Sequence, residues 1–292
     1  MKCAPRVLWD YAELGRISNL PTCVSNVLVG CAIGAAGQTF PWSSAPWIAA
    51  AVCLFYVAGM ALNDAVDVEI DRRERPERPI PSGRIRLREA YGLVGLAFAA
   101  GLAVLSLLGP AALATGLALV AVIILYDLLH KRFAASVMLM GSTRGLVYLV
   151  AAVAVGWPLA VRPALLLAGT LTLYTIAITV VARSENQQQL DARRWISVAM
   201  PVVVLAVAWQ VRPAEWLLAI LGGVALAAWL ARAGAAVFQS PPNTKAAVLT
   251  WISGMCLVDT YFLALLARPA AAAVALGCFS LTVYAHRRVM GT

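Results

Sequence analysis

Long apolar runs separated by short polar connections dominate this chain. Ten of them have about the 20 residues that an α-helix needs to cross the ~30 Å hydrocarbon core of a bilayer. The pattern therefore predicts an all-α, polytopic transmembrane bundle in one integral-membrane domain, residues 1–292. The expected spans are 17–37, 45–64, 88–108, 110–129, 136–156, 162–183, 195–211, 213–235, 245–266 and 268–286.

Composition agrees with a membrane protein. The chain is 62% hydrophobic and 13% charged, with a mean hydropathy of +0.81, which excludes an ordinary soluble domain. Its six cysteines are scattered without a CxxC pair and it has two distant histidines, so neither a zinc site nor a disulfide framework is indicated. The net charge of +9 is explained by basic residues around the apolar runs, without a nucleic-acid partner.

Basic residues collect at one set of helix ends. Nineteen of the 23 lysines and arginines fall there, whereas the opposite ends hold Arg162, Arg212 and Arg268. Because cytoplasmic connections are enriched in lysine and arginine, this asymmetry predicts that the basic ends are cytoplasmic. An even number of spans then puts both termini in the cytoplasm, and we expect a bacterial plasma membrane.

A short acidic stretch follows the second apolar run. It contains Asn63, Asp64, Asp67 and Asp71, and the three carboxylates share one face if the helix continues. Carboxylates at the C-terminal end of a helix oppose its macrodipole and repel one another, and a bound divalent cation would remove both problems. Mg²⁺ suits this position because it takes hard oxygen ligands and is usually shared with substrate phosphates. We predict that these four residues hold the metal.

Arginines follow the acidic stretch at once. The guanidinium group of arginine can donate two parallel hydrogen bonds to phosphate oxygens. Four such groups stand here, on Arg72, Arg73, Arg75 and Arg78. The acidic face and the basic loop together predict a magnesium–diphosphate site at a membrane surface. The alternative is a solvated cytoplasmic loop that follows a transmembrane helix.

Two segments of the sequence carry a family resemblance. Residues 63–84 read NDAVDVEIDRRERPERPIPSGR, and Gly15–Gly30 read GRISNLPTCVSNVLVG. The first resembles the first signature motif, NDxxDxxxDRxxRPxRPIPSG, of the UbiA superfamily of intramembrane prenyltransferases, and the resemblance spreads over most of the chain. It implies a helical membrane enzyme that uses Mg²⁺ to ionise an allylic prenyl diphosphate and transfers the prenyl group to an acceptor. Nine spans are commoner in that family, which makes 268–286 the candidate extra span.

The resembled family usually carries a second acidic motif after its sixth span, with carboxylates four residues apart. This chain has Glu185 there, then Gln189 at the fourth following position, and a further acid only at Asp191. Glu185 could bind the metal, while Gln188 and Gln189 could supply neutral oxygens or hold waters. The alternative is a polar loop, and the departure leaves both a second metal and the acceptor class open.

Other polar residues supply candidates for substrate binding. Tyr126 and Lys131, in LYDLLHKR, resemble the tyrosine and lysine that help to hold diphosphate in the family, although Lys131 also fits a positive-inside flank. Arg144 lies inside the fifth run and needs an acid or phosphate partner, for which Glu185 and the diphosphate are candidates. Asn26 resembles a family position near the active cavity, with a helix–helix hydrogen bond as the alternative.

Two further acids are given structural interpretations. Asp259 lies deep in the run 245–266, where it could bond a backbone amide or an arginine or be protonated. Asp127 is expected to be a loop acid that balances Lys131. Neither is a predicted ligand.

The predicted function is transfer of a prenyl group from an allylic polyprenyl diphosphate to a small acceptor at the cytoplasmic membrane face. Arg72, Arg75, Lys131 and Arg144 would neutralise the departing diphosphate. The ARSE stretch, LYDLLHKR and the tenth span look more like the Ebo-cluster type of UbiA-like protein than the 4-hydroxybenzoate enzymes, which implies a cyclitol or sugar-like acceptor; an aromatic acceptor stays open. The rivals are a terpene cyclase of the same superfamily and a non-enzymatic lipid-binding or transport protein.

Overall fold

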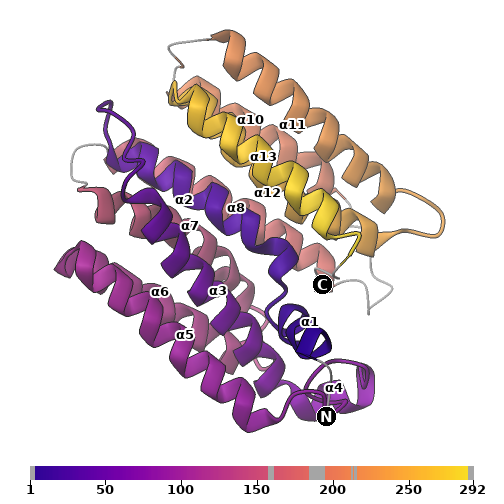
Figure 1. Ribbon diagram of the computed structural model, residues 1–292. Coiled ribbons are helices and arrows are strands. Elements are labelled where there is room, and N and C mark those ends of the chain that lie inside the picture. The colour runs from indigo at the N-terminus through magenta and orange to yellow at the C-terminus, as the bar shows by residue number, and fades with distance from the viewer. Residues whose placement is uncertain (1–3, 157–160, 184–194, 212, 214–215, 289–292) are drawn as a thin grey trace.

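The computed structural model describes residues 4–156, 161–183, 195–211, 213 and 216–288. Every regular element in these ranges is a helix (Figure 1). The elements are α1 (Ala4–Leu14), the 3₁₀ turn η1 (Ile17–Asn19), α2 (Leu20–Gly34), α3 (Ala45–Val66), α4 (Val68–Glu74), α5 (Leu87–Leu108), α6 (Pro110–Leu129), α7 (Ser136–Val155), α8 (Val161–Arg183), α10 (Ile196–Val211), α11 (Trp216–Val237), α12 (Thr244–Leu265) and α13 (Pro269–Ala285).

The apolar helices coincide with the predicted spans. Among the described residues, eight segments are long and apolar enough to cross a bilayer: η1 with α2, and then α3, α5, α6, α7, α8, α11 and α12. The apolar part of α10, Ile196–Val207, and α13 are shorter. The predicted all-α membrane bundle is therefore confirmed, while the count of ten spans stays a prediction.

The helices form a closed ring of neighbours. Each apolar helix from α2 to α13 packs against the next one along the chain, and α13 packs back against α2. Inside this ring, α2 also contacts α7 and α12, and α12 contacts α8. Two clusters of buried side chains result, one centred on α3, α5 and α6 and the other on α8 and α10 to α13, with α2 and α7 contributing to both.

Small residues let the central helices approach closely. A Cβ atom added at Gly30 of α2 would lie 2.5 Å from both the Tyr148 carbonyl oxygen and the Ala151 Cβ of α7. On the other side of α7, a Cβ at Gly141 would lie 2.7 Å from the Thr172 carbonyl oxygen of α8. In a bilayer, where helices gain little from hydrophobic burial against one another, such close backbone packing is a main source of association.

One end of the bundle carries the short helices α1 and α4, which lie beyond the ends of the long helices (Figure 1). The C-terminal end of α13 reaches the same end, because His286 Nε2 lies 2.7 Å from Asn19 Oδ1 in η1. We call this the polar end. The described parts of the chain thus begin and end on one side, as an even number of spans requires, and the cytoplasmic orientation stays a prediction.

Candidate active site

The acidic stretch spans the junction between α3 and α4. Asn63 and Asp64 belong to the last turn of α3, which ends at Val66, and Asp67 joins α3 to α4 with φ −85° and ψ 2°. The helix therefore does not continue unbroken through the three acids, although the amide of Asp71 still donates to the Asp67 carbonyl at 2.9 Å. All three carboxylates are nonetheless buried at the polar end.

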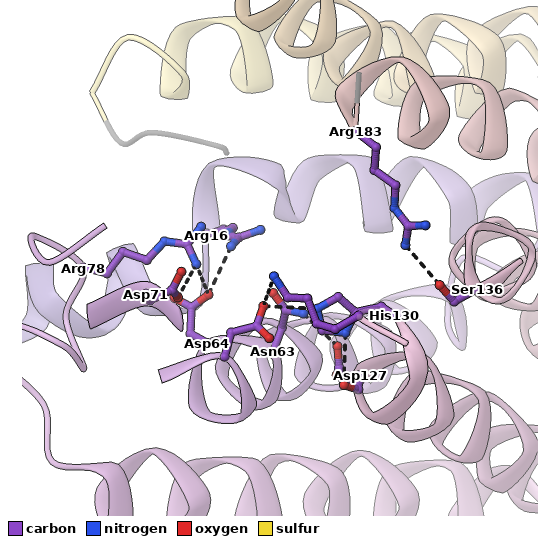
Figure 2. Close-up of polar contacts among 11 residues, drawn as sticks. Arg16, Asn63, Asp64, Asp71, Arg78, Asp127, His130, Ser136 and Arg183 are labelled. Carbon is purple, nitrogen blue, oxygen red and sulfur yellow. Dashed lines mark hydrogen bonds and ion pairs between the residues drawn. The ribbon is translucent and has the colours of Figure 1, made fainter. Parts of the chain in front are cut away.

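Asp64 and Asp71 share one arginine. Arg78 Nη1 lies 3.2 Å from Asp64 Oδ1 and 2.6 Å from Asp71 Oδ2, and Arg16 Nη2 lies 3.1 Å from Asp64 Oδ1 (Figure 2). Buried carboxylates without compensation are costly, so these cations account for the burial of the two acids.

Asp67 contacts a different pair of cationic side chains. Its Oδ2 lies 3.1 Å from His130 Nε2 and 3.2 Å from Lys131 Nζ. Burial raises the pKa of Asp67, but the hydrogen bond and charge of His130 and the charge of Lys131 lower it by more, so the net pKa lies below the usual value. Burial lowers the pKa of His130, but the Asp67 carboxylate outweighs it, and the net pKa is raised. Both effects favour the ion pair.

Asp127 lies inside α6 and not in a loop, which differs from the expected arrangement. It is buried, and its Oδ1 accepts a 3.0 Å hydrogen bond from Asn63 Nδ2 of α3. Its Oδ2 is buried without a hydrogen-bond partner among the described residues. Lys131 pairs with Asp67 and not with Asp127. The partner of Asp127 is Asn63 (Figure 2). A buried orphan carboxylate oxygen beside a carboxylate cluster is a free site for a cation or a donor.

The loop after α4 is held by the N-terminal helix. Arg84 Nη1 lies 2.8 Å from Asp10 and 2.6 Å from Glu13, both on α1. The hydrogen bond from Arg84 to Glu13 is the main cause of the raised pKa of this guanidinium. The chain then turns at Arg16, whose φ of 42° is uncommon for a residue with a side chain. The ion pairs of Arg84 hold α1 against the loop after α4, and this arrangement places Arg16 beside Asp64.

A largely apolar cavity runs into the bundle from this cluster. It lies between α3, α6 and α7 with Cys23 of α2 on its wall, and it holds roughly 560 Å³ of empty space, its open mouth included. Tyr126 and Asp127 line its polar end, whereas Val52, Phe55 and Leu119 line it deeper in the bundle. Such a cavity accepts an apolar chain whose charged end remains among the carboxylates and cations.

Arg144 also lines the cavity, and its contacts among the described residues are with neutral side chains. Its Nη1 donates to Asn26 Oδ1 at 3.1 Å and lies 3.3 Å from Cys23 Sγ, while its guanidinium sits 5.2 Å from the Tyr56 ring centre. Asn26 then donates to Asp259 Oδ2 at 2.8 Å. Asn26 thus makes a helix–helix hydrogen bond and contacts a residue that lines the cavity, while its role at the active cavity stays a prediction.

Asp259 is fully buried away from the cavity. Ser25 Oγ donates to its Oδ2 at 2.5 Å, and the Tyr148 hydroxyl donates to its Oδ1. The bonds come from side chains of α2 and α7 and not from the backbone amide or arginine that were expected. They tie α12 to both neighbours, which agrees with a structural role.

The other predicted residues fall into three groups. Lys131 and Tyr126 belong to the site, and the Tyr126 ring stacks on His130 at 5.2 Å between centres. Arg72 and Arg75 are exposed, and Arg72 pairs with Glu69 at 2.6 Å. The second-motif residues, Glu185, Gln188, Gln189 and Asp191, lie outside the described residues.

Four site residues were not predicted from the sequence. Arg16 lies 48 positions before Asp64, and no local spacing connects them. Asp127 and His130 stand three apart within LYDLLHKR, a spacing that places them on one helix face, and this was an available signal. Arg78 was counted among the basic residues but not selected as a site residue.

The donor set suits Mg²⁺ in chemical type. Carboxylate oxygens of Asp64, Asp67, Asp71 and Asp127 are hard ligands, and one Asp127 oxygen is buried without a partner. Within the described part of the chain, no three such groups lie close enough to hold an ion as they stand. Asp64, Asp67 and Asp71 pair with Arg16, Arg78, His130 and Lys131. A metal could bind only if these cations moved away from the carboxylates, for example to phosphate oxygens.

Curated relatives match part of the chain. A digeranylgeranylglyceryl phosphate synthase of Sulfolobus acidocaldarius is 32% identical over 117 residues, which are 40% of this chain and 41% of that protein. The enzyme of the same name from Methanopyrus kandleri is 38% identical over 104 residues, 36% of this chain and 37% of that one. The aligned segments thus span only about two fifths of these relatives.

Solved structures share the fold over a longer range. A UbiA homologue from Archaeoglobus fulgidus bound to GPP and Mg²⁺ superposes with a TM-score of 0.63 at 13% identity, covering 88% of this chain and 99% of that one. A structure concerned with digeranylgeranylglyceryl phosphate synthase in membranes gives a TM-score of 0.62 at 20% identity, covering 90% and 99%. The Ebo-cluster branch stays a prediction. Because the sequence model of the UbiA prenyltransferase family matches residues 23–289, almost the whole chain, this integral membrane protein belongs to the UbiA prenyltransferase family.

Proposed function

We propose that the protein transfers a prenyl group from an allylic prenyl diphosphate to a small hydroxyl-bearing acceptor, with Mg²⁺ as cofactor. The observation that carries this proposal is the apolar cavity between α3, α6 and α7, which ends at Asp127 beside the buried carboxylate–cation cluster. An apolar chain with a diphosphate head has the polarity pattern of this cavity and its polar end.

The proposed donor pose follows from the lining residues. The prenyl tail lies along Phe55, Val52 and Leu119, and the diphosphate lies near Asp67 and Asp127. Lys131 pairs with Asp67, and Arg16 and Arg78 pair with the neighbouring Asp64. These three cations would turn from carboxylate to phosphate oxygens. The predicted ligands Arg72 and Arg75 are solvent-facing, so any contact from them is at the rim.

The chemistry is a heterolytic substitution. The bond between the allylic carbon and the diphosphate oxygen breaks, and its electron pair leaves with the diphosphate. The acceptor atom, an alcohol oxygen or an aromatic ring carbon, then bonds to that carbon, and the proton that this atom carried passes to the diphosphate or to water. Mg²⁺ bound by Asn63, Asp64, Asp67, Asp71 and the predicted Glu185 would supply charge stabilisation to the leaving group. The π face of Tyr126, on the cavity wall, can stabilise a transient allylic cation.

Three classes of acceptor are candidates. The curated relatives are named digeranylgeranylglyceryl phosphate synthases, which supports a glyceryl phosphate alcohol. The resemblance of the ARSE stretch, LYDLLHKR and the tenth predicted span to Ebo-cluster proteins supports a cyclitol or sugar-like alcohol, and an aromatic acceptor is the third candidate. All three present an oxygen or ring carbon that can capture an allylic cation.

The test uses the purified full chain in detergent or nanodiscs. Labelled prenyl diphosphates are supplied with glyceryl phosphate, cyclitol and aromatic acceptors, with and without a chelator, and both diphosphate release and labelled product are measured. We expect an acceptor-dependent product that requires Mg²⁺. A cyclised hydrocarbon formed without acceptor would replace the proposal with a terpene cyclase, and absence of turnover with all donors would remove the enzymatic function.

A further inference from the structure

A second groove lies far from the cavity, on the outer face formed by α11 and α13. It is lined by Trp229, Phe279, Ser280, Val283, Tyr284 and Arg287 and holds about 530 Å³ of empty space, open to the surroundings. Both helices pack on α12, so α12 lies between them at the base (Figure 1). No residue of this groove lines the cavity of the candidate active site.

The aromatic wall of the groove is held in place. The Trp229 indole nitrogen donates to the Thr250 carbonyl oxygen at 2.8 Å, which fixes the ring against α12. The Phe279 ring meets it edge-on, with ring centres 4.8 Å apart and planes at 89°. A rigid apolar wall of this kind can receive an alkyl chain without first paying to order its own side chains.

Arginines surround the same wall. Arg287 lines the groove, the Arg232 guanidinium lies 5.4 Å from the Trp229 ring centre, and the Arg288 guanidinium lies 5.8 Å from the Tyr284 ring centre. Between residues 216 and 288 the sequence has a single acid, Asp259, which is fully buried in its own network. The basic rim therefore has no carboxylate from α11, α12 or α13 to neutralise it.

The position along the bundle decides what can reach the groove. Arg287 follows His286, which contacts Asn19 at the polar end, so the arginines lie at the level where a bilayer has its headgroups. Below them, exposed Val224 and Leu276 continue the apolar surface of α11 and α13 toward the bundle centre. An occupant must then be apolar along its length and negative at one end.

We propose that this groove binds an anionic phospholipid of the surrounding membrane. One acyl chain lies along Trp229 and Phe279, and the headgroup phosphate lies among Arg232, Arg287 and Arg288. Such a lipid would hold α11 and α13 together at the polar end. The site takes its occupant from the bilayer and is separate from the donor cavity.

The test measures lipid binding by native mass spectrometry of the full chain released from detergent with equal amounts of phosphatidylglycerol and phosphatidylcholine. We expect a preference for phosphatidylglycerol in the unmodified protein. Each arginine near an anionic headgroup contributes about fivefold in affinity, so the combined change Arg232→Ala, Arg287→Ala and Arg288→Ala should weaken that binding by at least about tenfold. Arg268→Ala is the matched control, because Arg268 lies at the opposite end of α13.

The outcomes separate the possible ligands. Unchanged phosphatidylglycerol binding in the triple variant, or an equal loss in Arg268→Ala, would overturn the proposal. Displacement of the bound lipid by millimolar inorganic phosphate would show a simple anion site, and displacement by geranyl diphosphate would show a second substrate site; either result also overturns it. Because the three arginines are exposed and outside the candidate active site, the variant should fold, which its elution volume and unchanged thermal unfolding in lipid-free detergent verify.

Discussion

Two regions of this membrane bundle bury carboxylates, and they do so in opposite ways. At the polar end, Asp64, Asp67 and Asp71 are buried against arginine, lysine and histidine side chains. In the core, Asp259 is surrounded by Ser25, Asn26 and Tyr148, none of which carries a permanent charge. In the first arrangement both partners are charged, whereas in the second the carboxylate accepts hydrogen bonds from neutral groups.

This difference indicates which acids can change partners. At the polar end, a buried ion pair can be exchanged for a metal ion and a phosphate, because the charges on both sides find new partners. Asp259 has no such option, since its donors come from helices that must stay packed. We therefore expect the polar-end acids to control activity and Asp259 to control stability.

The largest effect is expected from Asp67→Asn. The change keeps the shape of the side chain and removes one negative charge from the proposed magnesium–diphosphate site. Loss of one oriented charge-stabilising group costs about 10²–10³ in rate in other enzymes, and loss of a metal ligand should cost at least that. Diphosphate release at saturating Mg²⁺ measures it, with thermal unfolding measured in parallel.

The control for this change is Glu69→Gln, which removes an exposed carboxylate two residues after Asp67, in α4. Among the described residues, Glu69 pairs with Arg72. It should leave the rate unchanged. Near wild-type turnover of Asp67→Asn would mean that the acidic stretch is a charged loop without a catalytic role.

The opposite half of the comparison is tested by Asp259→Ala. Three buried donors would lose their acceptor, and although hydrogen bonds inside membranes average only about 0.6 kcal/mol, unsatisfied buried groups cost more, so we expect a loss of about 2 kcal/mol in unfolding free energy. Activity per folded molecule should fall by no more than roughly threefold. Unfolding in detergent by denaturant and the donor assay measure the two quantities.

Thr260→Ala is the matched control, because among the described residues the Thr260 hydroxyl donates to the carbonyl of Cys256 in its own helix. It should change stability little. A hundredfold loss of activity in Asp259→Ala with unchanged stability would place Asp259 in the reaction. The polar-end acids and Asp259 would then not differ in role.

The sequence predicted the helices well because hydrophobic length is read directly along the chain. The runs at 88–108 and 110–129 differ from α5 and α6 by at most one residue at an end. The acidic stretch was found because Asp64, Asp67 and Asp71 are close in sequence. The break after Val66 was not, since a cap with near-helical dihedrals leaves no glycine or proline signal.

Contacts across the bundle were the part that sequence reasoning could not reach. Arg16 meets Asp64 only because α1 is clasped by Arg84, and Asn26 meets Asp259 across 233 positions. The arginines nearest to the acids in sequence, Arg72 and Arg75, point to solvent, whereas Arg78 turns back after the α4 helix ends. Side-chain direction depends on that turn, and composition does not encode it.

A smaller effect is expected from Arg78→Ala. Arg78 neutralises both Asp64 and Asp71, so its removal leaves one side of the proposed diphosphate site without its cation. We expect about a tenfold loss in kcat/KM, mostly through a higher KM for the donor, because Arg16 still faces Asp64. Arg78→Lys should recover part of the loss, since it keeps the charge but not the fork geometry. A rate that is equal in both variants would show that Arg78 acts only by packing.

The smallest effect is expected from Arg75→Ala. This change tests the contrast between the cations that pair with the buried acids, Arg16 and Arg78, and the exposed arginines. Arg75 is exposed, and its neighbours Arg72 and Arg73 can supply the same rim charge. We expect less than roughly a twofold change in kcat/KM at physiological salt, where exposed charges are screened. The measurement is the donor concentration dependence of diphosphate release at low and high salt. A tenfold loss that persists at high salt would mean that Arg75 binds diphosphate directly. The loop after α4 would then have to fold inward when the donor binds, and the solvent-facing arginines, not Arg16 and Arg78, would be the main diphosphate ligands.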